Sequence, residues 1–505
     1  MFYNMLDEMG YSDLLMKVPY TPPVFTGGAA VQKLLGEALE SGNIFIYGDY
    51  DVDGLMCAKI MSEGFRMAGA GRVDIYKYRQ RMHNLDPVAV SECIQGGYKY
   101  FVVCDTGSSD VSLLKKAVNS GIRVLVLDHH NTSYSYSDFE EDGIVVLNTT
   151  IENALGGEYE LSAGALCYTV MREFLAGREV EGYRQLAVYA VVSLYADCIS
   201  MRPALNRSIY YEAKGVSREE LPRCIALFLN EWSSFNARFI GYWFSPRVNS
   251  MFRSENLKVL NDLFFAREDN VITESRCLEK INSIYERDRE MVHKAADILS
   301  AEAVVLDNFV IADLYAVDEY ISVEANKLYN YTGLVANMLS SNFGKTAVTY
   351  CLYDNVYKGS VRDLYGRNYL PVFQRLCYAG GHNAAFGIKV RLFDFDEFMY
   401  DLDRVDKQFS ISGIGNTPVI IDYKYNEPDI AMIDDIATYN EFAGQDLPIV
   451  LLRKQMIGDV RERFNKYNYQ YSWGDCTIQS DHAVGFGSTV LIKPIHAGRL
   501  KLLVQ

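Results

Sequence analysis

The chain has 505 residues, of which 49% are apolar and 23% are charged. This length exceeds what one hydrophobic core supports, so we expect roughly two to four globular domains. The net charge of −16 argues against a protein that coats nucleic acid non-specifically. It does not exclude an enzyme that holds one strand end, because binding depends on the local potential rather than on the net charge.

The sequence shows no feature of a membrane or secreted protein. No apolar run approaches the about 18 residues that a membrane span needs, and the first residues lack the basic and apolar regions of a secretory signal. Ten cysteines are scattered without a CxxC pair, which indicates reduced thiols rather than disulfides or a zinc site. We therefore expect a cytoplasmic protein without a membrane partner.

From about residue 27, short apolar segments alternate with segments of helical apolar spacing. Helices are predicted at residues 29–39 and 111–118, among others. Strands are predicted at residues 44–47, 73–78, 100–104, 124–127 and 144–147. Repeated strand–helix–strand order predicts right-handed crossovers and a mainly parallel sheet.

The rest of the chain changes in character twice. Residues 161–299 are predicted to be mostly helical, and the charged run 274–296 is typical of a solvated connecting helix. Residues 303–395 mix strand-like and helical segments, with glycines clustered near their end. Beyond about residue 400, β-like stretches are predicted at residues 418–421, 449–452 and 489–493.

Acidic and imidazole side chains follow three of the early strands. The first strand runs into GDYDVDG at 48–54, a later one into CDTG at 104–107, and the next into LDHH at 127–130. In an open parallel sheet, ligands bind outside the carboxyl ends of the strands, so we expect these residues to converge. Carboxylates so close together repel one another unless cations lie between them. Carboxylate with imidazole suits two divalent cations and favours Mn²⁺, with Mg²⁺ as the alternative.

Other interpretations of these motifs are weaker. D-x-D-x-D-G also opens an EF-hand loop, but that loop needs a glutamate at its twelfth position, where this chain has Ile60. The GKT at 344–346 lacks the first glycine of a P-loop, because Leu339 stands in its place. Tandem histidines are more often structural than functional. Their position directly after Asp128, at the end of an apolar strand, favours function here.

These segments resemble the DHH phosphoesterase superfamily: DYDVDG its first motif, CDTG its second, LDHH its third, and YADCI at 195–199 its fourth. The resemblance implies that Asp105 bridges two metal ions and that His130 faces the substrate phosphate, which makes these two the catalytic residues. Many relatives have a histidine ligand where this chain has Tyr47, which leaves the coordination of one ion open. The implied metal ligands are Asp49, Asp51, Asp53, Asp105, His129 and Asp197.

Two segments in the second half resemble the substrate-binding DHHA1 domain that accompanies many DHH domains. GGHNAAFG at 380–387 is similar to its glycine–histidine signature, which implies that Gly380, Gly381 and His382 contact the substrate phosphate. KGSVR at 358–362 resembles a second DHHA1 segment, although Asp363 stands where serine is expected.

The segment PRVNSMFR at 246–253 resembles the PRxNxxxR stretch of the RecJ single-strand exonucleases. This resemblance implies that Arg247, Asn249 and Arg253 hold the terminal phosphate of a strand by charge-assisted contacts. The alternative is that the two arginines form ordinary interdomain ion pairs. The helix containing Asn282, Glu286 and Arg287 also resembles the RecJ interdomain helix.

The expected fold is α/β, with a parallel-sheet DHH domain, a helical linker, a smaller α/β DHHA1 domain and a β-containing C-terminal region. The corresponding boundaries are 1–26 for an N-terminal leader, 27–215, 216–300, 301–400 and 401–505. RecJ proteins often carry an OB-fold near the last region, so an OB-like barrel is one option there. Alternation of Tyr467, Tyr469, Tyr471 and Trp473 suits a strand whose aromatics lie in the core rather than a base-stacking surface.

The resemblance implies a two-metal exodeoxyribonuclease that degrades single-stranded DNA, rather than RNA, from 5′ to 3′ and releases 5′-mononucleotides. A single-strand-binding protein is the expected protein partner. Two alternatives stay open: a DHH phosphodiesterase for short oligonucleotides, cyclic dinucleotides or 3′-phosphoadenosine phosphate (pAp), and a non-catalytic replication or repair scaffold. The PRxN segment argues against the first, and the intact acidic motifs argue against the second.

Overall fold

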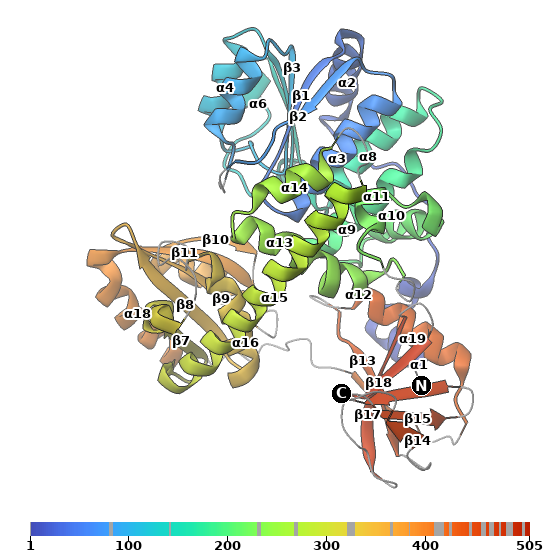
Figure 1. The fold of residues 1–505 in the computed structure, drawn as a ribbon, viewed down its shortest axis with the longest axis vertical. Coiled ribbons are helices and arrows are strands. Elements are labelled where there is room, and N and C mark those ends of the chain that lie inside the picture. Colours follow the sequence, from blue (N-terminus) through green and yellow to red (C-terminus); the bar gives the residue numbers. More distant parts are fainter. Residues whose placement is uncertain are drawn as a thin grey trace. The chain divides into compact units, whose positions relative to one another are not determined.

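The chain forms two compact units in the computed structural model (Figure 1). Unit 1 comprises residues 1–278 and 418–505, and unit 2 comprises residues 279–417. None of the described helices is long and apolar enough to cross a membrane. The structure describes residues 2–79, 84–140, 143–229, 234–266, 271–320, 329–363, 367–382, 384–408, 419–423, 427–443, 447–455, 461–463, 469–473, 476–480, 488–496 and 500–504.

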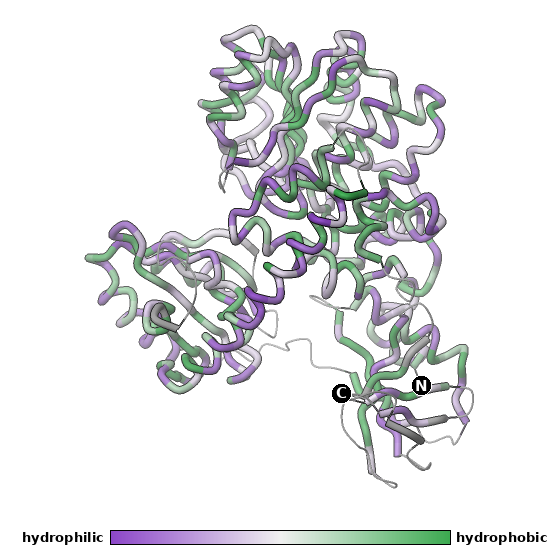
Figure 2. The backbone as a smooth tube through the Cα atoms, in the orientation of Figure 1, coloured by the Kyte–Doolittle hydropathy of each residue, from purple (hydrophilic) through white to green (hydrophobic). Residues whose placement is uncertain are grey.

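Unit 1 contains a five-stranded parallel sheet, sheet A, with the strand order β2-β1-β3-β4-β5. Figure 2 shows its strands as largely hydrophobic, and most of their side chains are buried, as expected of a parallel sheet covered on both faces. The predicted parallel α/β sheet is therefore confirmed. The strands are β1 (Asn43–Gly48), β2 (Arg72–Ile75), β3 (Tyr100–Cys104), β4 (Arg123–Asp128) and β5 (Ile144–Asn148).

The second strand is shorter than predicted, because β2 ends at Ile75 rather than at residue 78. Beyond it, Tyr78 pairs with a side chain instead of a strand. Its N–H donates to Oδ1 of Asn261 at 3.0 Å, and its carbonyl accepts from Nδ2 of the same residue at 2.8 Å. An asparagine amide offers both a donor and an acceptor, so it can replace a neighbouring strand.

The helices that follow the strands bury a large apolar surface in unit 1. Helix α9 has the sequence LAVYAVVSLYA, which is apolar on all sides, and it packs against α3, α8 and α10. The helices up to this point are α1 (Phe2–Met9), α2 (Gly28–Ser41), α3 (Val52–Met67), α4 (Pro87–Gln95), α5 (Val111–Val118), α6 (Ser137–Glu140), α7 (Thr149–Ala154), α8 (Ala163–Ala176) and α9 (Leu186–Ala196).

The helical region predicted at 161–299 is also confirmed. Its last helix, α15, contains the charged run 274–296 and crosses the boundary between the two units. The further helices are α10 (Ala204–Lys214), α11 (Arg223–Ala226), α12 (Ala237–Phe239), the π-helix η4 (Ile240–Phe244), α13 (Ser245–Arg253), α14 (Leu257–Phe264) and α15 (Val271–Glu302), with 3-10 turns η1 (Ser12–Leu15), η2 (Tyr183–Gln185) and η3 (Arg218–Glu220).

The C-terminal segment forms a seven-stranded mixed sheet with one helix, α19 (Ile430–Phe442). Its topology differs from the five-stranded OB barrel that is one option from the sequence. Tyr471 and Trp473 are buried, which confirms their core placement, whereas Tyr467 lies outside the described residues. In sheet order, the strands are β12 (Val419–Asp422), β13 (Val450–Gln455), β17 (Thr489–His496), β18 (Leu500–Val504), β16 (Cys476–Ser480), β15 (Tyr469–Trp473) and β14 (Arg461–Arg463).

The segment predicted as an N-terminal leader packs as part of unit 1. The Phe2 ring lies 6.1 Å from that of Tyr439 in α19, and Tyr3 donates to Asp435. Further along, the N–H groups of residues 26 and 27 donate to the carboxylate of Glu152. These contacts join the segment 2–27 to α7, which follows β5, and to α19.

Unit 2 contains a six-stranded sheet, sheet B, with hydrophobic clusters on both faces. One cluster joins sheet B to α15 and α16, and the other joins it to α17 and α18. The strands in sheet order are β10 (Tyr378–His382), β11 (Ala385–Arg391), β9 (Val356–Arg362), β8 (Thr346–Tyr353), β7 (Phe309–Asp313) and β6 (Val304–Val305). The helices are α16 (Thr332–Phe343), α17 (Leu370–Leu376) and α18 (Phe395–Gln408), with 3-10 turns η5 (Leu314–Tyr320) and η7 (Leu392–Asp394).

Two glycines shape the turn between β1 and α3. A Cβ atom at Gly54 would overlap the backbone of Asp49, and one at Gly48 would overlap the carbonyl of Gly54. The turn is closed by Asp51, whose Oδ1 accepts from the N–H of Gly54 at 3.0 Å. The acidic segment 49–53 therefore folds back on itself because no side chain occupies the inside of the turn.

We predict that Gly54→Ala lowers the free energy of unfolding of unit 1 by about 1–3 kcal/mol, because the backbone must shift to admit the methyl group. Gly28→Ala is the matched control, since a Cβ there meets only the Cβ of Phe25 at an ordinary 3.5 Å. Urea unfolding followed by circular dichroism measures both. Equal midpoints for the two variants would contradict the packing described for the turn.

Candidate metal centre

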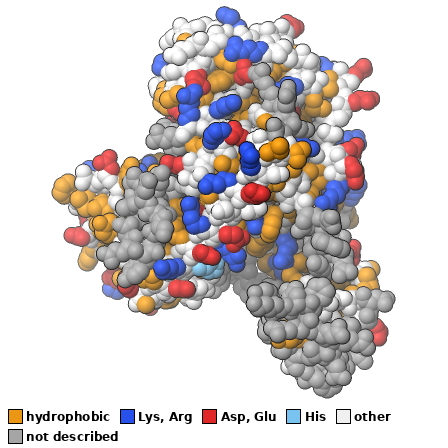
Figure 3. Space-filling view, in the orientation of Figure 1, with side chains coloured by type: hydrophobic (Ala, Val, Ile, Leu, Met, Phe, Trp, Pro, Cys, Tyr) orange, Lys and Arg blue, Asp and Glu red, His pale blue; other side chains and the backbone are white. Residues whose placement is uncertain are grey.

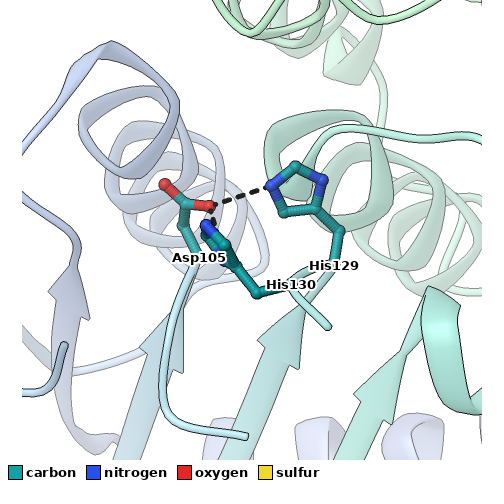
Figure 4. A group of neighbouring side chains, drawn as sticks. All are labelled: Asp105, His129 and His130. Carbon is teal, nitrogen blue, oxygen red and sulfur yellow. Dashed lines mark ion pairs between the residues drawn. The ribbon is translucent and has the colours of Figure 1, made fainter. Parts of the chain in front are cut away.

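Four side chains converge at the carboxyl end of sheet A. Nε2 of His129 lies 3.8 Å from Oδ2 of Asp53 and 3.4 Å from Oδ1 of Asp105. The same nitrogen lies 3.3 Å from Oδ2 of Asp197, which follows α9. Figure 4 shows Asp105 and His129 pointing toward each other from neighbouring strands, with His130 beside them. The structure thus brings together residues from all four motifs.

Asp53 is held in place by two helices. Its carboxylate accepts from the N–H groups of Ala163 at 2.9 Å and Gly164 at 2.8 Å, in the first turn of α8. The hydroxyl of Ser193 in α9 donates to it at 2.5 Å. A Cβ at Gly164 would overlap Ser193, so glycine permits this close approach. The positive end of the α8 dipole favours the negative charge there.

Asp105 has a different environment. Its backbone lies in the left-handed region with φ +63°, directly after β3, and its N–H donates to the carbonyl of Leu127 at 2.9 Å. The side chain is 1% exposed, yet neither carboxylate oxygen has a hydrogen-bond partner among the described residues. A buried carboxylate without such partners is costly unless a cation compensates it.

The ring of His129 is oriented by a backbone carbonyl. Nδ1 lies 3.0 Å from the carbonyl oxygen of Leu161, so this nitrogen carries the proton and donates. The other nitrogen, Nε2, faces the carboxylates. Metal-binding histidines commonly have this arrangement, in which an outer acceptor fixes the tautomer.

His130 is oriented by Asp128. Oδ1 of Asp128 accepts from Nδ1 of His130 at 2.9 Å and from the N–H groups of both histidines. Burial raises the pKa of Asp128, but the hydrogen bond and charge of His130 outweigh it and lower this pKa overall. Partial burial opposes protonation of His130, yet Asp128 raises the pKa of His130 to about 10. The His130 side chain is 54% exposed, so part of it is accessible to a substrate.

The carboxyl groups of the centre lose their protons less readily than ordinary carboxyl groups. Burial, followed by the charge of Asp197, raises the pKa of Asp53 to about 6. Burial and then the neighbouring carboxylates raise the pKa of Asp105 and of Asp49 well above the ordinary value. Burial also raises the pKa of Asp197. Bound cations would relieve this repulsion between the buried carboxylates.

The donor set fits divalent cations. Asp53, His129 and Asp197 form one group whose ligand atoms lie within 4.8 Å of one another, and Asp105, His129 and His130 form a second. Adjacent ligands of an octahedral ion with bonds of about 2.1 Å lie about 3 Å apart, close to the 3.3 and 3.4 Å separations seen here. Oxygen donors with one imidazole suit Mn²⁺ and Mg²⁺.

Tyr47, where many DHH proteins have a histidine ligand, is fully buried and engaged elsewhere. Its hydroxyl donates to the carbonyl of Asn84 at 3.1 Å and accepts from the N–H of Asp86 at 3.3 Å. Burial raises the pKa of Tyr47, so the phenol stays neutral. Tyr47 therefore supports the loop after residue 83 rather than binding a cation.

The helix that resembles the RecJ stretch is α13, and it connects to the centre through Tyr78. The Tyr78 hydroxyl donates to the carbonyl of Asp49 at 3.1 Å, and its ring packs against Phe252 at 5.2 Å. Arg247 is 4% exposed, lies 3.4 Å over the Trp243 ring and donates to its carbonyl. Asn249 and Arg253 on the same helix are half-buried.

The predicted phosphate-binding residues of the second half lie in unit 2. Gly380 and Gly381 are on β10, where Gly381 has φ +136° and a Cβ would press on Phe386 of β11. The backbone of His382 ends β10, and its side chain is outside the described part of the structure.

Several supporting residues are not evident from the sequence. Ser193, Gly164 and the carbonyl of Leu161 touch the centre only through tertiary packing. Asp128 is different, because the LDHH pattern places it directly beside both histidines. A carboxylate at the end of a buried strand is itself the signal for this positioning role.

Residues 43–199 match the family model described as DHH family, N-terminal domain. The chain is 23% identical over 376 residues to the single-stranded-DNA-specific exonuclease RecJ of Bacillus subtilis, a match that covers 72% of this chain and 45% of that protein. It is 22% identical over 400 residues to RecJ of Salmonella typhimurium, covering 73% and 67% of the two chains. The chain thus spans less than half the length of the first of these relatives.

Solved structures show the same fold. RecJ from Thermus thermophilus in complex with Mn²⁺ superposes with a TM-score of 0.73 at 17% identity, covering 99% of this chain and 74% of that one. An exonuclease RecJ bound to manganese gives a TM-score of 0.59 at 18% identity, covering 77% and 97%. The family match assigns residues 43–199 to the DHH family, the relatives make the chain similar to RecJ proteins, and the solved structures show that it shares their fold.

Proposed function

We propose that this protein is a metal-dependent phosphodiesterase that degrades single-stranded DNA from the 5′ end and releases 5′-mononucleotides. The observation that carries the proposal is Asp105, a buried carboxylate without hydrogen-bond partners among the described residues, surrounded by other carboxylates and by His129. Such a cluster is unfavourable as it stands and becomes favourable with two divalent cations, of which we expect Mn²⁺ to be preferred.

The residues of the chain would divide the work as follows. Two cations would be held by the predicted ligands: Asp49, Asp51, Asp53, Asp105, His129 and Asp197. The bound cations would lower the pKa of a water molecule and neutralise charge on the phosphate. His130, oriented and kept protonated by Asp128, would donate from Nε2 to a phosphate oxygen and so favour the more negative transition state.

Each unit would supply phosphate contacts of its own, from α13 in unit 1 and from β10 in unit 2. Arg247, Asn249 and Arg253 offer the planar donors that hold a terminal phosphate. Gly380 and Gly381 would let the backbone approach a second phosphate, with His382 beside them. Figure 3 shows Lys and Arg side chains, with Asp and Glu among them, on this face of the molecule. Cytoplasmic location and a single-strand-binding protein as partner stay predictions.

The direct test is degradation of 5′-labelled and 3′-labelled single-stranded DNA in Mn²⁺, beside a dinucleotide and a matching RNA strand. We expect rapid release of the 5′ label as mononucleotide, while the 3′-labelled strand shortens progressively. Cleavage of the dinucleotide alone would move the protein to the short-substrate phosphodiesterases. No metal-dependent cleavage of any substrate would indicate a scaffold.

We predict that Asp105→Asn lowers both Mn²⁺ affinity and turnover by more than about 100-fold, because this carboxylate would itself be a cation ligand. Loss of a residue that only orients a ligand typically costs about 10–100-fold. Titration calorimetry measures the affinity, and circular dichroism verifies folding. Asp138→Asn is the control, since that carboxylate is exposed and bonds only locally to Ser135. Wild-type Mn²⁺ affinity in Asp105→Asn would refute the assignment of this residue.

We predict that Asp128→Asn lowers turnover about 10–100-fold, because Asp128 orients His130 and both following N–H groups without binding a cation itself. Adding His130→Gln to Asp128→Asn should then lower turnover little further, since the two residues act together. Steady-state kinetics of the two single variants and the double variant measure this coupling. If the free-energy effects of the two substitutions were additive in the double variant, the proposed cooperation of Asp128 and His130 would be contradicted.

A further inference from the structure

The exposed part of sheet B has an unusual charge distribution. On one face of the sheet, β9 has Lys358, Ser360 and Arg362, of which Ser360 and Arg362 lie against α16, and β11 has Lys389 and Arg391. Tyr378 of β10 is directly opposite Lys389 and is 68% exposed. Among the residues of this face that the structure describes on these three strands, none is Asp or Glu. This acid-free surface belongs to a protein of net charge −16.

Two of these cations are direct neighbours across the sheet. Lys358 and Lys389 are opposite each other in the antiparallel pairing of β9 and β11. Like charges placed directly opposite each other destabilise a sheet. Burial, followed by the charge of Lys389, lowers the pKa of Lys358. The pair therefore carries a local cost that binding of an anion would offset.

Aromatic rings surround the same pair. Nζ of Lys358 lies 4.4 Å from the ring centre of Tyr329 and 4.0 Å from that of Tyr353. Nζ of Lys389 lies 5.0 Å from the ring centre of Tyr378. The rings position the two ammonium groups, and Tyr378 additionally presents an exposed aromatic surface. Arg391, by contrast, is already paired with Asp394 at 2.5 Å.

Lys358 and Lys389 lie on the same face of the sheet as the glycine signature. Gly380 is opposite Gly387, which is opposite Ser360, and Lys389 and Lys358 lie two residues further along these strands. Same-face residues of a strand repeat at about 6.6–6.8 Å. An extended chain with regularly spaced negative charges can therefore run along the sheet from Gly380 and Gly387 to the two lysines.

We propose that Lys358, Lys389 and Tyr378 form an additional subsite for single-stranded nucleic acid, in which the two lysines contact a backbone phosphate each and Tyr378 stacks on a base. The proposal rests on the proposed nuclease function and extends it to unit 2 beyond the glycine signature. Phosphate contacts and base stacking affect the salt dependence of binding differently, because only the phosphate contacts release counterions. The three residues can therefore be tested separately.

The experiment measures binding of fluorescent oligo-dT in EDTA by anisotropy, as a function of salt. For Lys358→Gln/Lys389→Gln, the slope of log K against log salt should fall by about 1.4, or 0.7 per phosphate contact. For Tyr378→Leu, affinity should fall on the order of tenfold with the slope unchanged. Lys358→Arg/Lys389→Arg should keep the wild-type slope, because the charges remain.

The matched control is Lys115→Gln/Lys116→Gln on α5 of unit 1, which removes the same charge from exposed positions and should leave the slope near the wild-type value. Equal slopes for the two Gln pairs, with Tyr378→Leu binding like wild type, would overturn the subsite. Nuclease activity of the wild type is measured in parallel. An active wild type with unchanged binding in the variants refutes the subsite alone, whereas an inactive wild type with the predicted slope change refutes the nuclease function alone.

Discussion

Repulsion between buried carboxylates is the constraint on which the rest of this structure depends. Asp53 and Asp105 are each 1% exposed, and Asp49 and Asp197 lie close enough to raise the pKa values of the cluster further. A fold would not retain such a cluster for stability, because hydrophobic residues of similar size would be less costly. The cluster makes sense as a receptor for cations, and its surroundings are arranged accordingly.

That arrangement relies on rigid elements. The first turn of α8 and the hydroxyl of Ser193 fix Asp53, the carbonyl of Leu161 fixes the tautomer of His129, and Asp128 fixes His130. Each of these partners lies on or next to a buried strand or helix. Ligands held in this way need little reorganisation when a cation or a phosphate binds, which is the usual requirement for electrostatic catalysis.

Much of the fold and the centre could be predicted from local sequence. Strands of sheet A appear as short apolar runs, and the carboxyl-end rule then places Asp53, Asp105 and His129 together. The motif resemblance was needed for Asp197, because it follows a helix rather than a strand. The predicted strand 73–78 extends beyond the observed end of β2, because the side-chain amide of Asn261, far along the chain, replaces strand pairing at Tyr78. Contacts of that kind leave no periodic pattern.

We propose above all that the converging strand ends bind two cations around Asp105. Anomalous diffraction from crystals grown with Mn²⁺ tests it most directly. We expect two anomalous peaks about 3.5–4 Å apart, with Asp105 between them and Nε2 of His129 at one of them. A single peak away from Asp105, or no peak at this end of sheet A, would contradict this proposal.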